Sequence, residues 1–177
     1  MKICFYPQGW YARLRQNVGA YRPWLLDQGS LTRRIMARCP AFGVRGVRVA
    51  MGWAAVEGVA RHPQRALLRE VFLHCGDTPV VYAHSVLPLA SLHGRWGQLR
   101  NLGGRPLGDV LFRDPQVERA PLQFKKLRAR HWLYRRACRH LDNPPATLWA
   151  RRSTFVLRHR AIQVTEVFLP AIRELSR

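Results

Sequence analysis

The sequence is poor in lysine and in acidic residues. Only three of its 30 basic residues are lysines (Lys2, Lys125 and Lys126), and 10 acidic residues leave a formal net charge of +20. Such an excess is typical of proteins that bind nucleic acid or another anionic surface. Replacement of lysine by arginine throughout a chain is just as typical of a biased coding composition. The charge alone therefore assigns no partner.

Long apolar runs are also missing. No stretch approaches the roughly 18 uninterrupted apolar residues of a transmembrane helix. Residues 1–10 contain Pro7 and Gly9 where a signal peptide needs its apolar run. We therefore expect a cytoplasmic protein.

Motifs for metals and nucleotides are absent as well. The seven histidines form no HExxH motif, and the glycine-rich run 103–108 lacks the GK[ST] ending of a phosphate loop, so we expect no metal site and no nucleotide site. No CxxC pair occurs, which predicts reduced, packed cysteines in a cytosolic protein. The four cysteines are Cys4, Cys39, Cys75 and Cys138.

What is present suffices for one α+β domain. The chain has 177 residues, of which 47% are hydrophobic, and it contains no repeat or linker, so we expect residues 1–177 to form a single domain. Short turns between strands favour one antiparallel sheet with helices on one face. The patterns predict helical pieces at 23–39, with a break at Gly29 and a cap at Ser30, strands at 47–54, 67–75 and 80–87, short helical pieces at 89–112, a helix at 124–141, and a hairpin of 153–159 with 162–169.

Two charged residues stand on apolar strand faces. Glu166 shares a face with Val164 and Phe168 by the two-residue period of a strand, and Arg69 shares one with Val71. One interpretation is a structural salt bridge between Arg69 and Glu166, or a solvated face. The other is an internal pocket for a small ligand with a carboxylate that the arginine binds and a hydroxyl that the acid meets.

A basic segment raises a separate hypothesis. Residues 125–139 contain seven cations, with Trp132 and Tyr134 between them, and this helix is predicted either to contact phosphates or an anionic membrane or to be a solvated face. The remaining excess of positive charge is spread along the chain, which weakens the nucleic-acid interpretation.

Several sequence blocks, in order, resemble the chorismate pyruvate-lyase family of bacterial ubiquinone biosynthesis. They are Trp24-Leu25-Leu26 with Gly29-Ser30-Leu31-Thr32-Arg33-Arg34, Leu68-Arg69-Glu70-Val71-Phe72-Leu73, Val86-Leu87-Pro88 with Pro106-Leu107-Gly108 and Leu111-Phe112, Leu148-Trp149-Ala150-Arg151-Arg152-Ser153, and Thr165-Glu166-Val167-Phe168-Leu169-Pro170. Residues 36–63 and 118–147 match poorly.

The resemblance implies a cofactor-free lyase that converts chorismate to 4-hydroxybenzoate and pyruvate. The family's key arginine falls on Arg69 and its key glutamate on Glu166. In the family the product carboxylate is held by that arginine and two backbone N–H groups, which fall on Leu31 and Leu107, while the glutamate meets the ring hydroxyl. Methionine is common in the family where this chain has Leu31, a change that a backbone contact tolerates. Segments 23–39 and 89–112 would be the flaps over the site.

The substrate's second carboxylate needs another cation, for which Arg152 is the candidate. Nothing in the sequence demands more than a monomer, and no specific nucleic-acid partner is expected. Two alternatives remain. One is a non-catalytic module of the same fold that binds small aromatic acids, although the first motif begins at Trp24 and leaves no room in this chain for a DNA-binding domain. The other is a polyanion-binding protein that uses the basic helix, with or without weak association with an anionic membrane.

Overall fold

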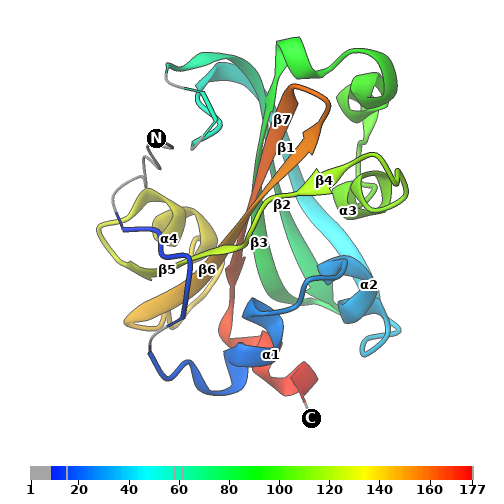
Figure 1. The fold of residues 1–177 in the computed structure, drawn as a ribbon. Helices are drawn as coiled ribbons and strands as arrows, with labels where there is room; N and C mark the ends of the chain where they lie inside the picture. The colour runs from blue at the N-terminus through cyan, green and yellow to red at the C-terminus, as the bar shows by residue number, and fades with distance from the viewer. Residues whose placement is uncertain (1–8, 15, 58, 61, 177) are drawn as a thin grey trace.

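In the computed structural model, one antiparallel sheet runs through the described residues, which are 9–14, 16–57, 59–60 and 62–176. Its neighbouring strands follow the order β1-β2-β3-β7-β6, and both β4 and β5 pair with β6 (Figure 1). The strands are β1 (Phe42–Ala54), β2 (Gln64–Cys75), β3 (Thr78–Pro88), β4 (Glu118–Arg119), β5 (Gln123–Arg128), β6 (Thr147–Leu157) and β7 (Arg160–Phe168).

The strands follow the residue alternation of the sequence. The predicted strands at 47–54, 67–75 and 80–87 and the hairpin of β6 with β7 are confirmed. Gly76 has a φ of 58° in the turn between β2 and β3, a left-handed conformation that glycine adopts without strain. The single antiparallel sheet of the predicted α+β class is thus present.

The helices are short. They are α1 (Arg22–Leu25), α2 (Leu31–Met36), α3 (Leu107–Leu111) and α4 (Trp132–Ala137), with 3-10 turns η1 (Gly19–Tyr21), η2 (Leu89–Ser91), η3 (Gly94–Asn101) and η4 (Pro170–Ser176). The predicted break before α2 is confirmed, and the Ser30 hydroxyl caps that helix by accepting a bond from the Arg33 amide at 3.4 Å. Among the described residues, no helix has the length and apolar character needed to cross a membrane.

Helices cover both faces of the sheet. Figure 1 shows α2 and α3 on one side and α4 on the other. On the first side, Trp24 and Ile35 pack in a core with Val71 and Phe168. On the other side, Leu133 and other residues of α4 pack with side chains of the opposite strand faces, such as Phe72, Tyr82 and Val167. The expected placement of all helices on one face therefore holds for the flaps but not for α4.

The predicted helix at 124–141 is wrong over its first half. Residues Gln123–Arg128 form strand β5, which pairs along β6 from Gln123 opposite Arg152 to Arg128 opposite Thr147. The open backbone edge of β6 offers hydrogen bonds that outweigh a local helical pattern, a tertiary effect that periodicity does not report. The helix begins only at Trp132, where the His131 imidazole accepts a bond from the Leu133 amide.

The prediction of reduced cysteines is also wrong for two of the four. Cys39 and Cys75 form a disulfide, with their Cα atoms 5.8 Å apart. The pairing of Phe42 with Cys75 in the sheet brings the chain after α2 against the end of β2. The two cysteines are 36 residues apart, so no local sequence pattern indicates this contact. Cys138 is a free thiol, and Cys4 lies outside the described residues.

Candidate active site

A pocket lies between the flap-covered face of the sheet and the segments of α2 and α3. Its sheet wall comes from strands β1, β2, β3, β4, β6 and β7, and its cover comes from residues 30–32 and 106–112. The predicted flaps therefore do contribute residues over one site. The residues that line it include Ser30, Leu31, Arg69, Leu107, Gly108, Phe112, Arg119, Arg151, Ser153, Phe155 and Glu166.

Arg69 is a buried cation without a carboxylate partner among the described residues. Arg69 is 3% exposed, and its Nη2 atom donates to the carbonyl oxygens of Gly103 and Arg105 at 3.0 Å each. The Nε atom is buried and has no hydrogen-bond partner in the described part of the chain. Burial lowers the pKa of the guanidinium because it penalises the charged form. An anion in the pocket would relieve that cost.

Glu166 pairs with a different arginine. Arg151, which is fully buried, donates through Nε to Glu166 Oε2 at 2.5 Å and through Nη1 to the carbonyl oxygens of Trp24 and Asp27 at 2.8 and 2.7 Å. The structural salt bridge between Arg69 and Glu166 is therefore not formed. The hydrogen bond and ion pair of this carboxylate use Oε2, which leaves Oε1 without a partner among the described residues.

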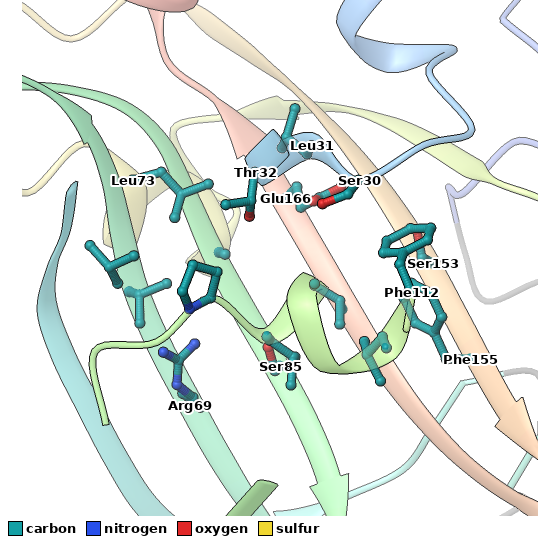
Figure 2. Close-up of a pocket in the computed structure, with 18 of the residues that line it drawn as sticks. Ser30, Leu31, Thr32, Arg69, Leu73, Ser85, Phe112, Ser153, Phe155 and Glu166 are labelled. Carbon is teal, nitrogen blue, oxygen red and sulfur yellow. The ribbon is translucent and has the colours of Figure 1, made fainter. Parts of the chain in front are cut away.

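The sheet register keeps Arg69 and Glu166 apart on one face. Arg69 lies opposite Ser85 of β3, and Glu166 of β7 lies opposite Ala83 of the same strand. Two strand spacings of about 4.8 Å thus separate them laterally by about 10 Å. Figure 2 shows the two side chains at different parts of the pocket.

Leu31 and Leu107 occupy equivalent positions in the two flaps. Each is the first residue of its helix, α2 or α3, where a backbone amide has no carbonyl acceptor within the helix. The Gly103 and Arg105 carbonyls bound by Arg69 come just before Leu107, so the start of α3 lies at the Arg69 end. The start of α2 adjoins the start of α3, because a Cβ atom at Gly108 would lie 3.2 Å from Ser30 Oγ and 3.7 Å from Thr32 Oγ1. The residues that carry the two amides therefore lie at neighbouring parts of the pocket cover.

A close approach of the flaps depends on a glycine. A Cβ atom at Gly108 of α3 would lie 3.2 Å from Ser30 Oγ, the cap of α2. The absence of a side chain at Gly108 therefore lets the two helix N-termini converge over the pocket.

Comparisons with known proteins agree with this geometry. The family profile described as chorismate lyase matches residues 13–176. The chain belongs to the chorismate lyase family. A relative from Nitrosomonas europaea, named "Probable chorismate pyruvate-lyase", is 50% identical over 86% of this chain and 88% of its own. Another of that name, from Methylobacillus flagellatus, is 41% identical over 92% of this chain and 94% of its own.

Solved structures share the fold of this chorismate lyase family member. The crystal structure of the PhnF C-terminal domain superposes with a TM-score of 0.55 at 15% identity, covering 81% of this chain and 86% of that one. The C-terminal domain of a histidine utilization repressor from Pseudomonas syringae pv. tomato has a TM-score of 0.51 at 14% identity, covering 73% and 92%. At such identities the likeness shows the fold alone.

Arg152, the candidate for the second carboxylate, points away from this pocket. It is 3% exposed, forms a close ion pair with Glu57, and donates to Gln123 Oε1 from Nε at 3.0 Å and Nη2 at 2.6 Å. Burial lowers its pKa to about 10. Because neighbouring residues of a strand face opposite sides, Arg151 faces the pocket and Arg152 does not.

Sequence reasoning missed three polar groups of the site. Arg151 and Ser153 share a strand face with Phe155, so the two-residue period of β6 carried a signal for both. Arg119 lies in β4, which has two residues and therefore no readable period. Among the described residues, no cluster of three or more His, Cys, Asp or Glu side chains is placed to hold a metal ion.

Proposed function

We propose that the protein is a chorismate pyruvate-lyase that eliminates pyruvate from chorismate to give 4-hydroxybenzoate, the step that opens ubiquinone biosynthesis. The observation that carries this proposal is the pocket between Arg69 and Glu166 in a chain of the chorismate lyase family. A buried arginine with a free Nε and a glutamate with a free oxygen fit a small aromatic acid with a carboxylate and a hydroxyl at opposite ends.

At one end of the proposed site, Arg69 and the amides of Leu31 and Leu107 bind the ring carboxylate. Arg69 is bonded to the carbonyls that precede α3, and the start of α3 adjoins the start of α2 at Gly108 and Ser30, which supports this assignment. At the other end, Glu166 accepts a hydrogen bond from the C4 hydroxyl.

The reaction needs orientation more than strong acid–base chemistry. The C3–O bond breaks and its electron pair leaves with the enolpyruvyl oxygen, while the ring loses the C4 proton and becomes aromatic. The released enolpyruvate gains a proton on its methylene carbon and becomes pyruvate. Since aromatisation makes this step favourable, fixing the ring between Arg69 and Glu166 and stabilising the leaving anion supply the catalysis. Glu166, bound to Arg151, acts as a positioning acceptor.

Several wider expectations belong to the same proposal. We infer that residues 1–177 work as one chorismate lyase-like domain, as a cytoplasmic monomer and without a cofactor. The basic segment 125–139 is proposed to give at most weak association with an anionic membrane. Its cations lie on a strand and a short helix, and Lys126 contacts the Trp149 ring at 5.8 Å, so they do not form one helical stripe.

The test is a cofactor-free assay of the purified protein with chorismate in the presence of EDTA. We expect equimolar 4-hydroxybenzoate and pyruvate, with at least about 100-fold lower kcat/KM in Arg69→Met and Glu166→Gln variants that remain folded. Turnover that survives both substitutions would refute the site. Tight binding of 4-hydroxybenzoate without turnover of chorismate would indicate a non-catalytic binding module, and salt-dependent binding of RNA without either would indicate a polyanion-binding protein.

A further inference from the structure

The charges that line the pocket do not balance. Three arginines, Arg69, Arg119 and Arg151, face one carboxylate, Glu166, among the lining residues. Arg151 and Glu166 form an ion pair with each other. The remaining two guanidinium groups have no carboxylate within ion-pair distance in the described residues. A pocket in which two of three cations lack an ion-pair contact among the described residues suits a ligand with two negative charges.

Arg119 is held in a defined place by its neighbours. Its guanidinium carbon lies 5.4 Å from the ring centroids of both Phe112 and Phe155. Its Nε and Nη2 atoms donate to Ser153 Oγ at 3.0 and 2.6 Å. Burial, with a contribution from the nearby charge of Arg151, lowers the pKa of Arg119 to about 10, so the group stays protonated at neutral pH but gains from a bound anion.

Hydrogen-bond donors remain for that anion. The four bonds of Arg119, two to Ser153 and two to the carbonyls of Gln28 and Gly29, leave one of its five N–H groups without an acceptor in the described part of the chain. Ser153 is 1% exposed, and its oxygen accepts from Arg119, so its own O–H is left to donate. Both residues line the pocket, so one cationic and one neutral donor are available to a ligand there.

The donors of Arg119 and Ser153 lie on the far side of the pocket from Arg69. Figure 2 shows Ser153, Phe112 and Phe155 on the side opposite to Arg69. In the sheet Arg69 is opposite Ser85, Ser85 is opposite Val164 and Val164 is opposite Ser153, so three strand spacings of about 4.8 Å separate Arg69 from Ser153. A ligand that contacts both guanidinium groups through carboxylates therefore needs two of them.

We propose that Arg119 and Ser153 form a second carboxylate subsite, which binds the carboxylate of the enolpyruvyl side chain. The assignment rests on the proposed function and replaces Arg152 as the second cation. The second subsite also distinguishes the binding of substrate from that of product. The substrate occupies both Arg69 and Arg119, whereas 4-hydroxybenzoate has a single carboxylate and occupies Arg69 alone.

A structural role for Arg119 is the alternative to be excluded. Its Nη1 atom donates to the Gln28 carbonyl at 2.7 Å, which ties the loop before α2 to the sheet. A residue that only latched this flap would affect every ligand in the pocket equally. A subsite affects only ligands that carry the second carboxylate.

The experiment compares two ligands by titration calorimetry. One is 3-(1-carboxyvinyloxy)benzoate, a non-reacting aromatic dicarboxylate, and the other is 3-hydroxybenzoate, which lacks the second carboxylate. We expect Arg119→Met to weaken binding of the dicarboxylate by about 10- to 150-fold, the range for hydrogen bonds to charged groups, and to change that of the monocarboxylate less than threefold. Ser153→Ala should shift the same ratio in the same direction. Arg113→Met is the matched control, because Arg113 is exposed and does not line the pocket.

Equal weakening of both ligands by Arg119→Met and by Ser153→Ala would overturn the subsite and leave a flap latch. An unchanged dicarboxylate affinity in either folded variant would overturn it as well. Because neither ligand reacts, the result is independent of turnover. Failure of the wild-type protein to convert chorismate would refute the proposed function, whereas loss of the ligand-specific difference refutes the subsite alone.

Discussion

At the residue scale, the pair of Arg151 and Glu166 links the site to the fold. Arg151 bonds Glu166 of β7 and the carbonyls of Trp24 and Asp27 at the first flap, and it is fully buried. The same side chain therefore orients the Glu166 carboxylate at the pocket and holds the segment that leads to α2. Removing one partner of such a pair leaves the other charge desolvated and unpaired.

The Arg151→Met variant tests this account through stability. We expect the free energy of unfolding in urea to fall by about 3 to 5 kcal/mol, because Glu166 loses its counter-charge in a largely buried site. The double variant Arg151→Met with Glu166→Leu should recover part of that loss, since no buried carboxylate remains. A loss below about 1 kcal/mol in the single variant, or a double variant no more stable than the single one, would contradict the buried-pair account.

At the scale of elements, the two flap helices meet through Gly108. A Cβ atom there would press on Ser30 Oγ at 3.2 Å, whereas one at Gly104 would meet nothing within 4 Å. A side chain at Gly108 therefore separates the start of α3 from the start of α2, and with it the residues Leu107 and Leu31. Nearby Gly104 offers a matched position at which the same substitution has room.

We expect Gly108→Val to raise the Kd for 4-hydroxybenzoate by about 5- to 150-fold, which corresponds to the usual range for overpacking. Gly104→Val should leave the Kd within about twofold. Fluorescence or calorimetric titration measures both. Equal affinities of the two variants would show that convergence of the flaps does not shape the site.

The disulfide between Cys39 and Cys75 joins the end of the first flap to the end of β2. Chain entropy for a loop of this sequence separation, 36 residues, predicts that Cys39→Ser lowers the free energy of unfolding by about 3 to 4 kcal/mol relative to the oxidised protein. Cys138→Ser, at the free thiol, should change it by less than about 1 kcal/mol. Urea unfolding with and without reductant measures both, and equal stability of oxidised and reduced protein would refute a stabilising role.

The elements also show what the sequence could and could not reveal. Alternation predicted β2, β3 and β7, and it placed Arg69 and Glu166 on strand faces that line the pocket, because period two is a local property. It missed that β5 pairs with β6, since the free edge of a distant strand has no local signature. The disulfide and the position of Arg119 depend on contacts between segments far apart in the chain, so no local pattern reports them.

At the scale of the whole molecule, the formal charge of +20 attracts a dianionic substrate such as chorismate. The basic residues are spread along the chain, so they create a general positive field and no single docking stripe. That field should raise the association rate of chorismate at low salt. The effect should weaken as salt is added, because the Debye length falls from about 30 Å at an ionic strength of 0.01 M to about 8 Å at 0.15 M.

We therefore expect kcat/KM for chorismate to fall about 2- to 10-fold when ionic strength rises over that interval, with a smaller change in kcat. Steady-state kinetics in potassium chloride measures both constants. A kcat/KM that does not depend on salt would mean that the net charge plays no part in substrate capture.

The central claim is that the pocket holds an aromatic acid between Arg69 and Glu166. The most direct measurement is a crystal structure of the protein with 4-hydroxybenzoate. The account predicts the carboxylate within hydrogen-bond distance of the Arg69 guanidinium and the Leu107 amide, with the hydroxyl on Glu166. A carboxylate seated on Arg119 or Arg151, or a ligand outside this pocket, would contradict it.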